Sequence, residues 1–303
     1  MIPAFMNVGI DFAGPLYVKE SKLENKKVYV CLFTCMVTRA IHLELVEDMT
    51  TEQFLLALKR MMSRRGRSQL IISDNAKSFK KASDILKRLF KNVKDLREKL
   101  ANLGIRWKFI TERAPWHGGF YERMVGSAKR SLKRVLGKSR LTQIEMETVL
   151  TEVEAQINSR PLTVVSSSSE DLSPLTPGHL TIGRSPQQLP DIDRETERMS
   201  LGKRWKYQQT LLKHFWNRWS KEYLTELQQM RKWQDVRDNV KVGDVVLVAD
   251  DNQRKQDWML GRIQDLHPGR DGLVRSVTVK TSGGLRRRPV QRLRLLEPAN
   301  AEN

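Results

Sequence analysis

Three carboxylates occupy positions at which a protein containing a β-sheet can present side chains for chemistry. Asp11 lies between apolar neighbours in a β-like run, Asp74 follows another apolar run, and Glu122 falls where a helix begins after a glycine-containing loop. Carboxylate oxygens, completed by water and phosphate oxygens, are the ligands that Mg²⁺ prefers. Two such ions can activate an attacking oxygen and stabilise a leaving one in phosphoryl transfer. These residue types therefore predict a divalent-metal site if the fold brings them together.

Each carboxylate also has a purely structural interpretation. Asp11 would then be a hydrogen-bonded group within a strand, because burying it without a partner is costly. Asp74, which precedes Asn75, would cap a turn or a helix, and Glu122 would complement a helix dipole. Considered singly, the residues leave both interpretations open.

Hydrophobic periodicity predicts the elements that would position these groups. A meander of three antiparallel strands opens the chain, and a helix, a strand, a helical region, a strand and two helices follow it. The predicted elements cover residues 7–12, 27–33, 40–45, 52–61, 69–73, 80–103, 106–110, 120–136 and 142–158. Thr51 is the expected cap of the first helix, and Thr142 with Glu145 has the spacing of a capping box. In a mixed sheet the first and fourth strands can be neighbours, which would place Asp11 beside Asp74.

The second half of the chain has a different composition. A serine run and several prolines indicate an irregular stretch that reaches about residue 200. A long aromatic helix is predicted over 202–233, in which Trp216 and Trp219 favour a core or an oligomer interface over a base-stacking surface. Short strands between residues 240 and 296 fit a small barrel. The predicted domains are an α/β domain over 1–185, a linker and helix over 186–236, and a basic barrel over 237–298.

The chain is strongly basic, with 54 Lys and Arg against 35 Asp and Glu and a formal net charge of +19. Such an excess is typical of proteins that bind polyanions, although ribosomal, chromatin and membrane-surface proteins share it. The densest basic region has eleven Lys and Arg against three Asp between Arg254 and Arg294. It predicts DNA binding with little sequence preference, and a solvated surface is the alternative. The expected DNA contacts in this region are Arg262, Arg286, Arg287 and Arg288.

Several classes of protein are disfavoured. No apolar run approaches the roughly 18 residues of a membrane span, and the first residues lack the regions of a signal peptide, so neither insertion nor secretion is expected. Cys31 and Cys35 lie in an apolar run and are expected to be reduced, buried thiols. No zinc is expected, because two cysteines and five histidines lack regular ligand spacing.

Several motifs occur in a linked order that resembles a known family. The segments Val8–Leu16, Phe33–Leu45, Ser73–Asn75 and Ala114–Arg123 together resemble the integrase of BEL/Pao-type LTR retrotransposons. The resemblance covers about residues 5–185 as the catalytic core and continues through 175–180 into the C-terminal region. It implies an α/β fold, namely a ribonuclease-H-like mixed sheet flanked by helices, followed by a linker helix and a small all-β SH3-like barrel. It also implies that Asp11, Asp74 and Glu122 are the catalytic triad and bind two Mg²⁺ or Mn²⁺ ions.

The activity implied by this resemblance is metal-dependent DNA phosphoryl transfer, in which the element's 3′ ends are trimmed and joined to target DNA. Lys129 lies on the same helical face as Glu122 and resembles a lysine that contacts element-end DNA in retroviral integrases. Gly126 stands where those enzymes often have another lysine. The resemblance further implies a homo-multimer that acts in the nucleus after passage through the cytoplasm. Arg286–Arg288 is only a weak nuclear-entry signal.

The alternative is a catalytically silent fragment, or a domesticated DNA- or chromatin-binding protein, that keeps the integrase fold. The presence of Asp11, Asp74 and Glu122 favours catalysis. The family's amino-terminal His/His/Cys/Cys zinc module does not occur in this sequence, which favours the alternative. A host nuclease of the same fold fits less well, because the linked motifs match the integrase group.

Overall fold

A computed structural model of the chain describes residues 2–21, 24–91, 104–110, 119–164, 174–184, 186, 202–229, 240–248, 258–268 and 274–299. The chain divides into two compact units, and each has its own five-stranded sheet. The first unit comprises residues 1–158 and 187–215, and the second comprises 159–186 and 216–303.

The sheet of the first unit has the strand order β3-β2-β1-β4-β5. Its strands are β1 (Asn7–Lys19), β2 (Asn25–Cys35), β3 (Ile41–Val46), β4 (Leu70–Ser73) and β5 (Arg106–Phe109). β1, β2 and β3 form an antiparallel meander, as predicted, whereas β4 runs parallel to β1 and β5 runs parallel to β4. This mixed arrangement makes β1 and β4 direct neighbours.

β1 is longer than its sequence pattern predicts, since the prediction ended this strand at residue 12. A bulge between Ala13 and Leu16 lets the strand continue past Gly14 to Lys19. At Gly14 the backbone φ is +139°, and a Cβ atom there would lie 2.8 Å from Cδ1 of Tyr29. Glycine is therefore required at the bulge for both conformation and space.

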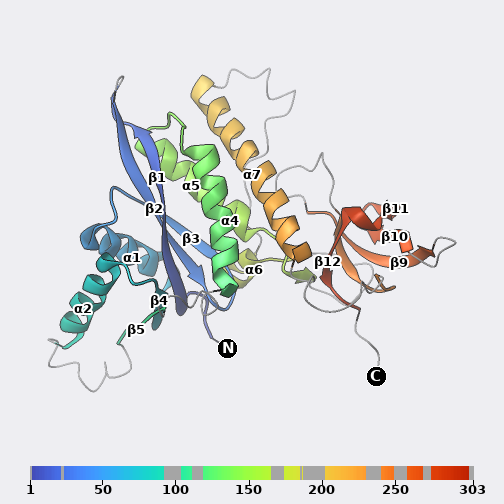
Figure 1. The fold of residues 1–303 in the computed structure, drawn as a ribbon, viewed down its shortest axis with the longest axis horizontal. Coiled ribbons are helices and arrows are strands. Elements are labelled where there is room, and N and C mark those ends of the chain that lie inside the picture. The colour runs from blue at the N-terminus through green and yellow to red at the C-terminus, as the bar shows by residue number, and fades with distance from the viewer. Residues whose placement is uncertain are drawn as a thin grey trace. The chain divides into compact units, whose positions relative to one another are not determined.

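Four helices pack on this sheet, and Figure 1 shows α1 and α2 on one side of it and α4 and α5 on the other. Their bounds are Thr51–Arg65 (α1), Lys77–Lys91 (α2), Gly119–Leu136 (α4) and Gln143–Asn158 (α5). The expected cap of α1 at Thr51 is wrong, because the Thr50 hydroxyl accepts the hydrogen bond from the Gln53 N–H at 3.3 Å. The capping box of α5 is confirmed, with Thr142 and Glu145 bonded reciprocally at 2.7 and 3.4 Å. The part of the predicted 80–103 helix beyond residue 91 lies outside the described residues.

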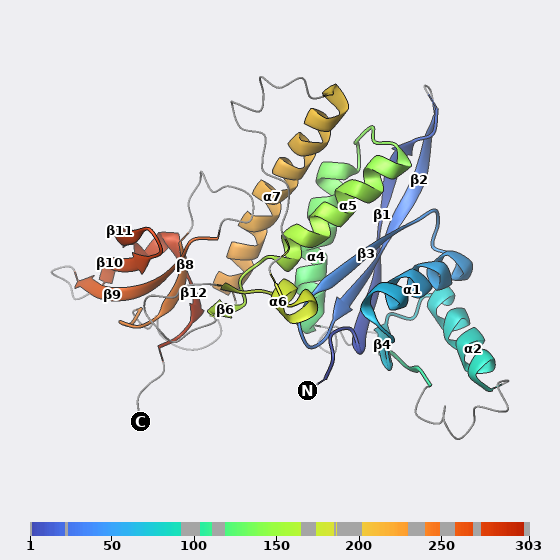
Figure 2. The same ribbon diagram turned by 180° about the vertical axis from the view of Figure 1, so that it is seen from behind.

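Alternate residues of β1 face opposite layers of helices. Val8 and Ile10 are buried in a core that also contains Phe54 of α1 and Phe79 of α2. Because successive side chains of a strand point to opposite faces, Asp11 lies on the face covered by α4. Figure 2 shows the same layers from behind, with α5 running along β3.

A buried ionic network joins β3 to α1 and α5. His42, whose side chain is 3% exposed, lies between two carboxylates, with Nε2 2.9 Å from Glu44 Oε1 and Nδ1 3.1 Å from Glu154 Oε2. The other donors to these two carboxylates are Arg60, Arg64, Arg65 and the backbone N–H of Leu43. One strand and two helices are thus held together by charges that share partners.

The network shifts the titration of its members. Burial disfavours the charged form of His42, but the hydrogen bonds to Glu154 and Glu44 outweigh burial and raise its pKa above the ordinary 6.5. Burial likewise opposes ionisation of Glu44, yet hydrogen bonds from His42 and Arg60 hold its pKa below the ordinary 4.5. The network therefore favours a charged imidazolium and a charged carboxylate.

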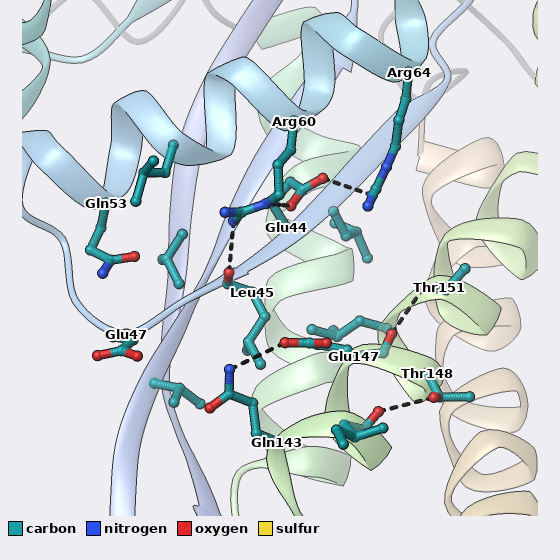
Figure 3. A pocket seen from close by; sticks show the side chains of 16 residues that line it. Glu44, Leu45, Glu47, Gln53, Arg60, Arg64, Gln143, Glu147, Thr148 and Thr151 are labelled. Atoms are coloured by element: carbon teal, nitrogen blue, oxygen red, sulfur yellow. Dashed lines mark hydrogen bonds and ion pairs between the residues drawn. The ribbon is translucent and has the colours of Figure 1, made fainter.

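The same network forms one wall of a pocket between β3, α1 and α5. Figure 3 shows Glu44, Arg60 and Arg64 on one side of this pocket and Gln143 and Glu147 of α5 on the other. Its volume is about 530 Å³. None of the predicted catalytic or DNA-binding residues lines it, so the pocket and the predicted site are separate features of this unit.

Part of the second unit differs from the irregular structure that its sequence predicts. β6 (Thr163–Val164) pairs antiparallel with β7 (Pro174–Leu175), and α6 (Pro177–Ile182) follows directly. The Thr176 hydroxyl accepts the His179 N–H at 3.3 Å, and His179 Nδ1 accepts the Thr176 N–H at 3.2 Å, which completes a capping box. The prediction is wrong for these residues, because such short elements carry no detectable periodicity.

The predicted aromatic helix is α7 (Lys203–Gln229), and its C-terminal half belongs to the second unit. Trp216 and Trp219 are fully buried, and their ring centroids lie 5.1 and 6.2 Å from that of Trp258. Tyr223 stacks on Trp219 with a centroid distance of 5.4 Å. The interpretation of these tryptophans as core residues is confirmed.

Five antiparallel strands complete the second unit in the order β11-β10-β9-β8-β12. Their bounds are Val245–Val248 (β8), Leu260–Pro268 (β9), Val274–Thr281 (β10), Gly284–Pro289 (β11) and Leu293–Glu297 (β12), with a 3₁₀ turn over Val290–Arg292. The sequence pattern did not predict β11, because its three consecutive arginines show no alternation of polar and apolar residues. The two sheets confirm the predicted fold class, a ribonuclease-H-like mixed sheet flanked by helices followed by a small all-β SH3-like barrel.

Two other expectations concern the cysteines and membrane spans. Cys31 and Cys35 are both free and buried, as predicted. Burial raises the pKa of the Cys31 thiol well above 9.0, and the charges of Glu44 and Asp11 add to this effect. Within the described part of the chain, no helix combines the length and the apolar character needed to cross a membrane.

The ionic network predicts how stability depends on pH. Because the pKa of His42 is raised on folding, its stabilisation is complete below about pH 6.5 and is lost as the pH rises through the folded-state pKa. Replacing His42 with Asn leaves two buried carboxylates without their shared cation, which should cost about 3–5 kcal/mol of unfolding free energy. Urea denaturation followed by circular dichroism across pH 5.5–8.5 measures both effects.

The matched control is His214→Asn, which changes an exposed histidine of α7. We expect it to keep the wild-type stability and pH profile. If the stability of His42→Asn fell with rising pH in parallel with that of the wild type, His42 would not be the group that makes stability depend on pH.

Candidate active site

Asp11 in β1 and Asp74 directly after β4 each follow the last paired residue of two neighbouring parallel strands. β1 and β4 pair with Ile10 opposite Ser73, so the next residue of each chain segment is one of the two aspartates. Strands in a sheet are about 4.8 Å apart, and paired residues point to the same face. The register therefore brings the chain segments of Asp11 and Asp74 together, and a shared site for their two carboxylates stays a prediction.

The Asp11 carboxylate has two engaged oxygens. Its Oδ1 accepts the Phe12 backbone N–H at 2.7 Å, and its Oδ2 forms an ion pair with the Lys129 ammonium of α4. The Asp11 side chain is 35% exposed and that of Lys129 is 27% exposed, so solvent reaches both groups. Both oxygens of Asp11 have partners, but the carboxylate is accessible to solvent and is therefore not the buried structural group of the alternative interpretation.

Hydrogen bonds to β5 position the turn that carries Asp74. Asn75 donates its side-chain amide to the Ile110 carbonyl at 2.6 Å, and the Ile110 N–H donates to the Ser73 carbonyl at 2.9 Å. The Trp107 indole N–H donates to the Ser73 hydroxyl at 2.9 Å. These contacts fix the end of β4, and sequence reasoning missed their residues because their partners lie more than 30 positions away.

Asp74 itself is exposed, and one of its oxygens has a local partner. Oδ1 accepts the Ala76 N–H at 3.0 Å, which closes a turn of the kind that the structural interpretation predicted. Its Oδ2 has no hydrogen-bond or ion-pair partner among the described residues. The turn-capping role thus uses one oxygen and leaves the other available for a cation.

Glu122 lies in α4, the helix that covers Asp11, although its side chain is outside the described residues. Glu122 precedes Lys129 by two helical turns, so both positions share one face of α4. Side chains of a helix lean toward its N-terminus, and a lysine at 129 therefore reaches back toward position 122. The Lys129 contact with Asp11 fixes which face of α4 meets the sheet.

The two described carboxylates fit a hard divalent cation. Both follow the last paired residues of the adjacent interior strands β1 and β4, and Mg²⁺ commonly uses only one or two carboxylates with water and phosphate oxygens. A group of three or more His, Cys, Asp or Glu suited to a metal does not occur among the described residues, from which the Glu122 side chain is missing. Asp11 and Asp74 supply two ligands, and a third would have to come from α4.

The predicted DNA-binding arginines of the barrel do not share one face. In the β10–β11 pairing, Arg286 lies opposite Val279 and Arg288 opposite Val277, both of which belong to the hydrophobic core. Arg287 lies opposite Thr278 instead, and it donates to the Ser276 hydroxyl at 3.2 Å. Strand alternation thus separates Arg287 from its two neighbours.

The outer face that carries Arg287 holds two further cations. Arg262 of β9 pairs in register with Lys280 of β10, and Lys280 has the same orientation as Thr278. We call Arg262, Lys280 and Arg287 the outer basic strip. Lys280 is one of the eleven basic residues between Arg254 and Arg294 and was not among the expected DNA contacts, although the alternation Val277-Thr278-Val279-Lys280 could have identified it. Arg254 lies outside the described residues, as do Lys255 and Arg270.

Comparisons with known proteins give one family match and several similar structures. A family of unknown function (DUF5641) matches residues 203–296, and no curated protein sequence matches the chain. The chain is similar to the cryo-EM structure of the simian T-cell lymphotropic virus intasome in complex with PP2A regulatory subunit B56 gamma, at 11% identity over 100% of this chain and 81% of that chain (TM-score 0.39). It is also similar to the catalytic core domain of BIV integrase, at 14% identity over 59% and 95% (TM-score 0.37). The HTLV-2 integrase catalytic core domain in complex with magnesium shares 15% identity over 60% and 98% (TM-score 0.35).

The anchoring of the Asp74 turn predicts a local loss of stability in Asn75→Ala. Removing the 2.6 Å hydrogen bond to Ile110 should cost about 1 kcal/mol of unfolding free energy, because the Ile110 carbonyl loses a partly buried donor. Hydrogen exchange of the Ile110 amide should also become faster. Asn25→Ala, at an exposed position of β2, is the matched control and should leave both quantities unchanged. Equal exchange in the two variants would contradict the anchoring role.

Proposed function

We propose that this chain is an integrase-type DNA polynucleotidyl transferase, and specifically the integrase of a BEL/Pao-type LTR retrotransposon. The observation that best supports the proposal is the register of β1 and β4, whose last paired residues, Ile10 and Ser73, directly precede Asp11 and Asp74, together with the contact of Lys129 in α4 with Asp11. The ordered motif resemblance supports the same triad. Residues separated by 62 intervening positions in the sequence would rarely meet in this way by chance.

The triad would hold two Mg²⁺ or Mn²⁺ ions, with Asp11 and Asp74 contributing from adjacent strands and Glu122 from α4. Such ions, when bound, neutralise charge at the attacking and leaving oxygens of a phosphodiester. In strand transfer, the 3′ hydroxyl of the element end loses its proton to solvent and its oxygen bonds to a target phosphorus. The bond from that phosphorus to the target's 3′ oxygen breaks at the same step. In 3′-end trimming, water is the attacking group.

The barrel would retain DNA through its backbone. The outer basic strip has cations on three adjacent strands, and such a surface contacts phosphates without reading bases. Because the substrates are element ends and target DNA, we propose action in the nucleus, by a homo-multimer that brings two ends together. These proposals rest on the same assignment of function.

The test of catalysis uses a labelled duplex with a recessed 3′ hydroxyl, a plasmid target, and Mg²⁺ or Mn²⁺. Losing a group that merely supports a metal ligand commonly costs about 10–100-fold, so Asp74→Asn should reduce joined product at least about 100-fold. Glu122→Gln should do the same. DNA retention by either variant should stay close to that of the wild type.

Two outcomes would count against parts of this proposal. If Asp74→Asn joined strands as well as the wild type, the triad assignment would be wrong. If the wild type formed no joined product but kept salt-sensitive plasmid binding, a silent or domesticated DNA-binding protein would be favoured.

The outer basic strip predicts a face-specific effect on DNA binding. The double variant Lys280→Ala/Arg287→Ala should lower the slope of log affinity against log salt by about 2, because two phosphate contacts are lost. Arg286→Ala/Arg288→Ala removes the same charge from the opposite face and should change the slope less. Fluorescence anisotropy with a random-sequence duplex at 50–300 mM salt measures both slopes. Equal slopes in the two variants would contradict a role for one face.

A further inference from the structure

The ion pair between Lys129 and Asp11 places a resident cation where the proposed site needs a metal ion. The Lys129 ammonium contacts Oδ2 of Asp11, while Oδ1 is occupied by the Phe12 N–H at 2.7 Å. Each oxygen of this carboxylate therefore has a donor. A divalent ion that binds Asp11 through Oδ2 must displace the ammonium, because two cations at one oxygen repel each other.

The Lys129 ammonium can dissociate from Asp11 and pair with it again. Its side chain is 27% exposed, and lysine carries a compact charge on a flexible four-carbon stem. It is followed on α4 by exposed basic residues, which would draw a polyanion to this end of the site: Arg130, Lys133 and Arg134. An ammonium released from Asp11 would therefore lie next to incoming phosphates.

We propose that Lys129 is an exchangeable counter-ion of the metal site, which pairs with Asp11 until a divalent ion replaces it and which then binds a DNA phosphate. The inference rests on the proposed function, since it takes Asp11 as a metal ligand. It adds a coupling that the triad alone does not contain. Metal binding frees the Lys129 ammonium to contact DNA. By linkage, DNA binding to Lys129 raises the affinity of the site for the metal ion by the same factor.

The first test measures binding of Mn²⁺ alone, without DNA, by the loss of the free-ion signal in electron paramagnetic resonance. Lys129→Met removes the competing charge and keeps a long side chain that favours helix. It should bind Mn²⁺ about two- to fivefold more tightly than the wild type, which is the factor expected from removing a partly exposed ion pair. Lys133→Met is the matched control, because it removes the same charge from an exposed position one turn further along α4.

The second test measures coupling to DNA by fluorescence anisotropy with a duplex that lacks a 3′ hydroxyl, so that no joining occurs. Mg²⁺ should raise the DNA affinity of the wild type and of Lys133→Met about two- to fivefold. It should leave the affinity of Lys129→Met nearly unchanged, because this variant has no ammonium to release. Lys129→Arg retains a cation and should behave more like the wild type. This control distinguishes loss of the charge from loss of side-chain packing in Lys129→Met.

The outcomes separate this inference from the proposed function. Asp11→Asn should weaken Mn²⁺ binding, and if it binds as the wild type does, the metal site itself is wrong. If Asp11→Asn weakens binding but Lys129→Met binds Mn²⁺ no more tightly than the wild type, the exchange is overturned and the metal site stands. A gain of equal size in Lys133→Met would also overturn the exchange, because net charge alone would then explain it.

Discussion

The parallel pairing of β1 with β4 is the constraint on which the candidate site depends. Its register sets Ile10 opposite Ser73, and a shift by one residue would turn either aspartate toward the apolar core. That core resists such a shift, because Val8, Ile10 and Ile71 are fully buried beneath α1 and α2. Hydrophobic burial on one face of the sheet thereby positions charged groups on the other.

The opposite edge of the sheet is held by charge as well as by apolar packing. His42 shares its ring between Glu44 and Glu154, and arginines of α1 complete both carboxylates. A buried ion pair is costly to desolvate and becomes favourable only when its remaining polar atoms also have partners. The Leu43 N–H supplies such a partner to Glu154, whereas the buried Nε of Arg65 has no hydrogen-bond partner among the described residues. The shared charges nevertheless join α1 and α5 to β3. The helix layers on both faces of the sheet are thereby aligned.

In the barrel, strand alternation decides which basic residues can act together. Three consecutive arginines suggest one patch in the sequence, yet Arg287 faces away from Arg286 and Arg288. Pairing across strands instead groups Arg287 with Lys280 and Arg262. The aromatic residues of α7 and Trp258 form a separate apolar layer in the same unit. The outer face of this small sheet therefore carries the outer basic strip, whereas its other face carries both the apolar core and Arg286 and Arg288.

Local pattern was enough to predict most strands and helices, a mixed sheet with helices, the basic character and the candidate carboxylates, because periodicity, capping and charge are properties of neighbouring residues. The ribonuclease-H-like fold class was implied by the motif resemblance. It failed for β11 and α6, whose short or charged segments have no clear period. The Lys129–Asp11 pair, the His42 network and the outer basic strip came only from the tertiary structure. Each joins residues from different elements, and strand register and helix packing, which no local window of sequence contains, decide which of them meet.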